Sequence, residues 1–162
     1  MAFWRLYYHL VWATKQRVPL ITADFEDQLY SFLVHKAGEL GAYIFQVNGM
    51  PDHIHTILTI PPKLSVSEVV KHLKGGSSHF INSRGFIDSK FRWQRGYGVL
   101  SLGEKQRSAA EEYVRNQKQH HLHSTTNSWL ERVADYDEGP YINENVLREP
   151  PVTYLENDDF PF

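Results

Sequence analysis

The stretch Ala42-Tyr-Ile-Phe-Gln-Val-Asn-Gly-Met-Pro-Asp-His-Ile-His-Thr-Ile-Leu-Thr-Ile60 decides the fold, because it contains two β-type runs separated by a short connection. Residues 42–48 and 53–60 are rich in β-branched and aromatic side chains, which favour strands. Asn48-Gly49 is a dipeptide typical of tight hairpin turns. The short connection therefore predicts that the two strands form an antiparallel hairpin.

The rest of the chain predicts two more strands and three helices around this hairpin. A Ser-x-x-Glu capping box marks a helix start at Ser65, and similar boxes occur at Ser101 and Ser108. The predicted elements are strands over 6–14 and 91–101, the second bent at Gly96 and Gly98, and helices over 23–40 after Thr22, over 66–82, and through Tyr113 to about 121. The order β-α-β-β-α-β-α predicts an α+β fold in which helices pack on one antiparallel sheet.

Two glycines, Gly75 and Gly76, lie inside the predicted helix over 66–82. Each costs about 1 kcal/mol relative to alanine in a helix interior. They indicate either the close approach of another backbone or a ligand, or a helix that ends there and restarts. The segment after residue 121 is predicted to be mostly loop, with one short helix near 128–134.

The composition restricts the class of protein. The chain has 162 residues, 41% of them hydrophobic, which suffices for one domain with a core. It has no cysteine, which excludes disulfides and thiolate metal sites and is typical of a reducing cytoplasm. No apolar run approaches the roughly 20 residues of a membrane-spanning helix, so we expect no membrane segment.

The net charge of −2 hides an asymmetry along the chain. Residues 1–121 hold fifteen Lys and Arg against ten Asp and Glu, whereas residues 122–162 hold two against nine. This division predicts a basic working domain followed by an acidic segment, although a solvated acidic face is the simpler interpretation.

Two groups of side chains have the chemistry of a catalytic site. His53 and His55 are separated by one apolar residue, so they point to the same side of a strand, and Asp52 precedes them. Tyr113 and Gln117 are four residues apart, so a helix would place them on one face. Imidazole nitrogens with an amide or carboxylate oxygen suit a divalent cation, and a phenol beside it can attack a phosphodiester. Either group alone is more often structural than catalytic.

Together the two groups lie within an ordered set of motifs that resembles a known family, the single-tyrosine HUH transposases (TnpA-like), including the REP-associated tyrosine transposases. The resemblance spans roughly residues 5–142. Its motifs are His9-Leu-Val-Trp-Ala-Thr-Lys15, Met50-Pro-Asp-His-Ile-His55, Leu73-Lys-Gly75, Phe91-Arg-Trp-Gln-Arg-Gly-Tyr-Gly98, Tyr113-Val-Arg-Asn-Gln117, His120-His121 and Tyr136-Asp137.

The resemblance implies a fold and an activity. The fold would be the HUH-endonuclease sandwich, a ferredoxin- or RRM-like arrangement, over residues 1–142. The resemblance does not extend to residues 143–162, which we expect to form an acidic, proline-containing tail. The activity would be the cleavage and rejoining of single-stranded DNA, often beside a short hairpin, through a 5′-phosphotyrosine intermediate. It would take place in the cytoplasm of a bacterial or archaeal cell.

The resemblance also implies a role for each side chain. Tyr113 would be the nucleophile. Asp52 and Asn116 are candidates to orient the metal ligands through hydrogen bonds without binding the metal themselves. The family forms homodimers, in many of which the tyrosine helix serves the partner's site, so we expect Tyr113 to act in trans. The ligands of Mg²⁺ or Mn²⁺ would be His53, His55 and Gln117.

Cationic and aromatic side chains are the usual contacts to single-stranded DNA. Trp93 and Tyr97 are candidate stacking platforms, although packing in the core is the simpler interpretation for both. We expect the histidines at 120, 121 and 123 to form a solvated helix end rather than a metal cluster. The candidate phosphate contacts are Lys15, Arg17, Lys71, Lys74, Arg92 and Arg95.

The residues also fit two other functions. A domesticated DNA-hairpin-binding protein or regulator would keep the fold without turnover. A metal-dependent hydrolase of small phosphoesters would use the histidines and would not need Tyr113. A covalent adduct between DNA and Tyr113 would distinguish the transposase from both.

Overall fold

A computed structural model describes residues 2–134 of the chain. The tail predicted over 143–162, the last part of the domain predicted over 1–142 and the motif Tyr136-Asp137 lie outside these residues. The elements, in chain order, are β1 (Tyr7–Ala13), a 3-10 helix (Lys15–Arg17), α1 (Glu26–Leu40), β2 (Tyr43–Met50), β3 (His53–Thr59), α2 (Val66–Arg84), β4 (Gly98–Leu102), α3 (Glu104–Arg115) and α4 (Gln117–Leu122).

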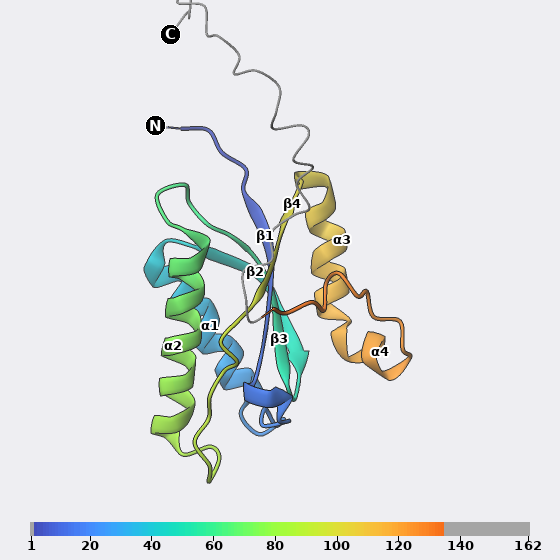
Figure 1. Ribbon diagram of the computed structural model, residues 1–162. Coiled ribbons are helices and arrows are strands. Elements are labelled where there is room, and N and C mark those ends of the chain that lie inside the picture. Colours follow the sequence, from blue (N-terminus) through green and yellow to red (C-terminus); the bar gives the residue numbers. More distant parts are fainter. Residues whose placement is uncertain (1, 135–162) are drawn as a thin grey trace, which may run out of the picture.

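The strands form one four-stranded sheet in the order β2-β3-β1-β4, and every neighbouring pair is antiparallel. Helices α1 and α2 cover one face of the sheet, whereas α3 and α4 lie on the other face (Figure 1). This architecture confirms the predicted α+β fold and the β-α-β-β-α-β-α order, with α4 as a short addition. Between residues 2 and 134, no helix combines the length and apolar character needed to cross a membrane.

The central strand β3 is buried on both faces, so its alternate side chains join two separate clusters. Ile54 and Leu58 point into the main core beneath α1 and α2. Ile57 points to the other face, where it packs against α3. Because side chains alternate along a strand, His53 and His55 share the face of Ile57 and point toward α3 and α4.

The turn between β2 and β3 lies later than the sequence predicts. Asn48 and Gly49 belong to β2, and the chain turns at Pro51 and Asp52 instead. A Cβ atom added at Gly49 would collide with the backbone carbonyl oxygen of His53. The glycine is therefore required by the close approach of two strands, not by a turn.

Helix α1 begins at Glu26 instead of residue 23, because a turn comes first. The carbonyl oxygen of Thr22 accepts hydrogen bonds from the amides of Phe25 and Glu26 at 3.3 and 3.0 Å. Phe25 therefore occupies the N-cap position that the sequence assigns to Thr22.

Helix α2 is continuous through Gly75 and Gly76, so the interpretation that it ends there and restarts is wrong. Its start is as predicted, with Ser65 Oγ accepting a hydrogen bond from the amide of Glu68 at 3.1 Å. A Cβ atom added at Gly76 would lie 3.2 Å from the ring of Phe32 in α1. This glycine therefore permits the close packing of α1 against α2.

Strand β4 is shorter than the strand predicted over 91–101. The segment before it pairs through single bridges, Trp93 with Thr14 and Tyr97 with Ala134. Lys74 of α2 holds the same segment, because its ammonium group donates hydrogen bonds to three successive carbonyl oxygens. These belong to Gln94, Arg95 and Gly96, at 2.7, 2.9 and 2.9 Å.

Helix α3 starts at Glu104, and neither predicted capping box forms its N-terminus, because Ser101 lies in β4 and Ser108 lies inside the helix. The side-chain oxygen of Gln106 instead accepts a hydrogen bond from the amide of Gly103 at 2.8 Å.

Helix α3 rests on the sheet with few apolar side chains, chiefly Ala110 and Val114. Arg107 adds to this contact, since its guanidinium carbon lies 5.1 Å from the ring centre of Tyr7 and 4.4 Å from that of Phe45. A cation over aromatic faces stabilises such a contact.

Replacing Gly49 with alanine should lower the free energy of unfolding by about 1–3 kcal/mol, the usual cost of overpacking, because the new Cβ meets the backbone of His53. Gly75→Ala is the matched control. Nothing lies within 4 Å of a Cβ at Gly75, and alanine there should add about 1 kcal/mol. Chemical denaturation measures both changes, and equal stability of the two variants would contradict the role of Gly49.

Candidate active site

His53, the first residue of β3, is oriented by the turn before it. Its Nδ1 lies 2.6 Å from Oδ1 of Asp52, and since a carboxylate only accepts, Nδ1 donates this bond. The bond to His53 lowers the pKa of Asp52. Arg17 approaches the other carboxylate oxygen at 3.3 Å, from a short segment in which Gln16 and Arg17 both have positive φ. Arg17 and Asp52 together fix the ring of His53 with Nε2 facing the site.

His55 is held by a second histidine from the neighbouring strand. Its Nδ1 lies 2.8 Å from Nε2 of His9 in β1, and the two rings stack with centres 5.1 Å apart. Burial lowers the pKa of His9 to about 3, so this imidazole is neutral, and burial also lowers the pKa of His55.

Glu131 connects these histidines to the other half of the site. Its Oε2 lies 3.2 Å from Nε2 of His53 and 3.1 Å from Nε2 of His55. Its Oε1 accepts hydrogen bonds from the hydroxyl of Tyr113 at 2.6 Å and from the amide nitrogen of Gln117 at 2.8 Å. Burial alone would raise the pKa of Glu131, but the bonds from His53, His55 and Tyr113 lower it well below its ordinary value, so the carboxylate is ionised.

Tyr113 is enclosed from two sides. Its hydroxyl donates to Glu131 and accepts a hydrogen bond from the amide of Asn127 at 2.9 Å. Burial and the bond to Glu131 raise the pKa of Tyr113, so the phenol is protonated in this arrangement.

Two further histidines reach the site from α4. Nε2 of His121 lies 3.5 Å from Oε2 of Glu131, and the ring of His120 stacks on Tyr113 with centres 4.5 Å apart. The expectation of a solvated helix end is therefore wrong for these two residues, whereas His123 is exposed.

Tyr113 and Gln117 belong to different helices, because Asn116 interrupts the helical run between α3 and α4 with φ −95° and ψ 17°. Both side chains nevertheless reach Glu131. The structure thus gives Asn116 the role of a helix junction.

Contacts with β2 and α1 hold this junction against the sheet edge of its own chain. The amide of Asn48 donates to the carbonyl oxygen of Arg115 at 2.9 Å. The ammonium group of Lys118 donates to Glu26 at 2.7 Å and to Asn48 at 3.1 Å. The two halves of the site therefore meet within one chain in this structure. The expectation that Tyr113 enters the site of a partner subunit in a dimer stays a prediction.

The donor set fits a divalent cation. One ligand atom from each of His53, His55 and Glu131 lies within 4.8 Å of the others. Oε1 of Gln117 is buried and has no hydrogen-bond partner among the described residues, which leaves it free to coordinate. Two imidazoles with a carboxylate and an amide oxygen suit cations such as Mn²⁺ or Mg²⁺, and Glu131 is a candidate oxygen ligand that the sequence-based set lacked.

The predicted DNA contacts divide into two groups. Lys15, Arg17, Lys71, Arg92 and Arg95 are exposed. Lys74 differs, because its ammonium group has three donors and bonds three carbonyl oxygens, which gives it a structural role, and its contact with a phosphate stays a prediction.

The two candidate stacking platforms, Trp93 and Tyr97, pack in the core, as the simpler interpretation holds. The ring of Trp93 packs edge-on against Trp12 and Phe91, and its indole nitrogen donates to Ser77 at 2.9 Å. Tyr97 packs against the main core.

Neither Glu131 nor His9 is recognisable as a site residue from the sequence pattern alone. Glu131 lies in a turn, and no local periodicity relates it to His55, which is 76 positions earlier in the chain. His9 stands in a predicted strand, and only the pairing of β1 with β3 brings it to His55.

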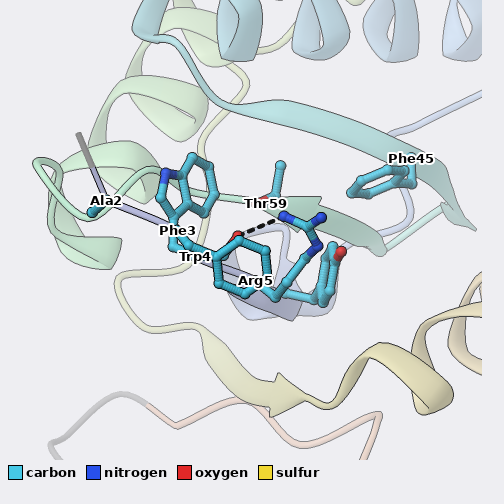
Figure 2. A pocket seen from close by; sticks show the side chains of 7 residues that line it. Ala2, Phe3, Trp4, Arg5, Phe45 and Thr59 are labelled. Carbon is cyan, nitrogen blue, oxygen red and sulfur yellow. Dashed lines mark hydrogen bonds between the residues drawn. The ribbon is translucent and has the colours of Figure 1, made fainter.

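A separate pocket of about 300 Å³ opens at the far end of the strands. Thr59, in this pocket, is six positions from His53, which corresponds to about 20 Å along β3. Figure 2 shows the side chains that line it, from the segment before β1 and from β1, β2 and β3. They are Ala2, Phe3, Trp4, Arg5, Tyr7, Phe45 and Thr59.

Comparisons with known proteins agree with this geometry. The family model described as "Transposase IS200 like" matches residues 2–117. The chain is 33% identical over 120 residues to the transposase for insertion sequence element IS200 of Salmonella typhimurium, covering 70% of this chain and 78% of that one. It is 28% identical over 119 residues to the ISDra2 transposase TnpA of Deinococcus radiodurans, covering 70% and 85%.

Two solved structures share the fold. A crystal structure of a candidate transposase from Deinococcus radiodurans matches with a TM-score of 0.59 and 29% identity, covering 72% of this chain and 93% of that one. A REP-associated tyrosine transposase bound to a REP hairpin matches with a TM-score of 0.56 and 14% identity, covering 78% and 76%. The family match over residues 2–117, with the fold and the clustered histidines, shows that this chain belongs to the IS200-like transposase family.

Proposed function

We propose that this transposase cleaves and rejoins single-stranded DNA through Tyr113, with a divalent cation held by His53, His55, Gln117 and Glu131. One observation carries the proposal. The carboxylate of Glu131 bonds the hydroxyl of Tyr113 and lies within 3.2 Å of both imidazoles, so the nucleophile and the cation ligands share one place.

The proposed reaction is a transesterification. The hydroxyl oxygen of Tyr113 forms a bond to phosphorus and loses its proton, while the bond from phosphorus to the 3′-oxygen breaks and that oxygen gains a proton. The products are a 5′-phosphotyrosine and a free 3′-hydroxyl, and attack by a 3′-hydroxyl rejoins the strand. A bound Mg²⁺ or Mn²⁺ would supply positive charge to the phosphate oxygens.

The described arrangement corresponds to a resting state. The pKa of Tyr113 is raised and that of Glu131 is lowered, so the carboxylate is too weak a base to take the phenolic proton. Attack requires Tyr113 to exchange its bond to Glu131 for contact with the phosphate. With a cation bound, Glu131 would give up its contacts with Nε2 of the two histidines and stand beside them as a further ligand.

The DNA would pass the end of the sheet that carries His53. Lys15, Arg17 and Arg92 are exposed near this end, where the amide of Lys15 bonds the carbonyl oxygen of Arg92 at 2.9 Å. Cations of this kind track a phosphate backbone. The solved relative that binds a REP hairpin supports a hairpin as part of the ligand.

The aromatic pocket is a second proposed contact. Phe3 is 86% exposed, and the guanidinium of Arg5 lies 4.7 Å from its ring centre. Tyr7 lies on the same face of the sheet as His53, since it pairs directly with Thr59. Because α3 covers this face between the two places, a DNA strand that passes around α3 to this far end of the sheet would stack a base in the pocket.

We further propose a homodimer in the cytoplasm of a bacterial or archaeal cell, as the resemblance implies. The contacts of Asn48 and Lys118 with the helix junction support a Tyr113 that is docked on its own chain before DNA binds.

Tyr113→Phe should abolish the covalent adduct with DNA and leave DNA binding intact, because only the phenolic oxygen is lost. The probes are single-stranded oligonucleotides that tile the DNA flanking the gene, incubated with Mn²⁺ and resolved on a denaturing gel. Tyr43→Phe, at an exposed tyrosine, is the matched control and should keep the adduct. An adduct that persists in Tyr113→Phe would overturn the nucleophile assignment.

Glu131→Gln should weaken Mn²⁺ binding at least about 10-fold, since loss of even a supporting residue weakens metal sites by that factor. Isothermal titration calorimetry measures the change. Glu112→Gln, at an exposed position of α3, should bind Mn²⁺ like the unaltered protein. Unchanged affinity in Glu131→Gln would remove Glu131 from the ligand set.

Phe3→Ala should reduce affinity for a 20-nucleotide oligothymidylate by about 5- to 150-fold, the range that loss of one stacked base produces. Fluorescence anisotropy without a divalent cation measures binding apart from cleavage. Val34→Ala, at a half-exposed position of α1 on the other face, should have no effect. Equal affinity of all three proteins would argue against the pocket as a DNA contact.

A further inference from the structure

The pair formed by His9 and His55 is the most deeply buried polar contact of the site. Both residues are almost completely buried, at 1% and 0% exposure, and their facing nitrogens are 2.8 Å apart. The strand register places His9 between Ile57 of β3 and Leu100 of β4. In these surroundings each imidazole nitrogen that faces the other must be matched, donor to acceptor.

Nδ1 of His55 needs a hydrogen-bond donor or an acceptor, depending on whether Nε2 carries the proton of the ring. When Nε2 donates to Glu131, which lies 3.1 Å away, a neutral ring has a bare Nδ1 that requires a donor. When the lone pair of Nε2 serves a cation, Nδ1 carries the proton and requires an acceptor.

An imidazole is suited to meet both demands. A carboxylate only accepts, as Asp52 does from His53, and so would keep the proton of its partner on Nδ1. Nε2 of His9 can donate in one tautomer and accept in the other without movement of either ring. Nδ1 of His9 is buried and has no partner among the described residues, so neither tautomer breaks another bond there.

We propose that His9 is a positioning residue that acts through His55. It holds the ring of His55 in one orientation while His55 changes tautomer between its bond to Glu131 and its use as a metal ligand. The inference rests on the proposed function for the identity of the metal ligands. It concerns a residue that touches neither the DNA nor the cation.

Nitrogen-15 NMR of histidine-labelled protein tests the tautomers directly. In the metal-free protein, the proton of His55 should reside on Nε2, and saturating Mg²⁺ should move it to Nδ1. In His9→Phe, which keeps a ring but offers no hydrogen bond, the proton of metal-free His55 should stay on Nε2 beside Glu131, and the nitrogen-15 shift of Nδ1 should move toward that of an imidazole nitrogen without a hydrogen-bond donor. A proton of His55 that stays on one nitrogen in both states of the unaltered protein would overturn the proposal.

Calorimetric titration with Mn²⁺ supplies the second readout. His9→Phe should bind about 10- to 100-fold more weakly, the usual effect of losing a residue that supports a metal ligand. His9→Gln should recover most of the affinity, since an amide both donates and accepts. Tyr8→Phe, one residue away on the other face of β1, is the control. Affinity of His9→Phe within twofold of the unaltered protein would also overturn the proposal.

Near-ultraviolet circular dichroism of each variant shows whether it is folded, and the recovery in His9→Gln separates positioning from packing. Adduct formation with DNA is measured separately in the unaltered protein. Absence of the adduct with the expected tautomers and Mn²⁺ affinities would contradict the proposed function and leave the role of His9 intact. Formation of the adduct, together with Mn²⁺ affinity in His9→Phe equal to that of the unaltered protein, would support the proposed function and contradict the role of His9.

Discussion

The position of β3 between β1 and β2 is the constraint on which both the core and the site depend. The strand is paired along both edges and covered on both faces, so its side chains from His53 to Leu58 are all buried. Alternation sends Ile54 and Leu58 to the main core and His53 and His55 to the other face. A register shift of one residue would exchange these sets and place imidazoles in the apolar core. The pairing that stabilises the domain therefore also builds the site.

Much of this could be predicted from sequence because the signals are local. β-Branched runs, apolar periodicity and the cap at Ser65 give the element order, and the spacing of His53 and His55 gives their shared face. What could not be predicted depends on pairing across the sheet or on a connection without periodicity. Gly49 indicates a turn from its dipeptide, yet it serves a close strand contact. Glu131 lies in a turn after α4 and reaches the histidines only because this segment passes the end of β3 that carries them.

The site concentrates polar groups that are costly to bury alone. Gln117, His55 and His9 are almost inaccessible to solvent, and an unpaired buried polar group costs roughly 1–3 kcal/mol. The carboxylate of Glu131 compensates several of them at once, since it faces two imidazoles, a phenol and an amide. Removing one member leaves the others unmatched, so substitutions within this cluster are expected to be non-additive.

The helix junction at Asn116 separates the two side chains that Glu131 joins. Tyr113 is positioned by α3, whose docking depends on small apolar contacts and on Arg107. Gln117 is positioned by α4, which Lys118 anchors to Glu26. A single continuous helix would force the phenol and the amide to move together. With the break, the phenol can leave Glu131 while the amide stays beside the histidines, as the proposed attack on a phosphate at a fixed cation site requires.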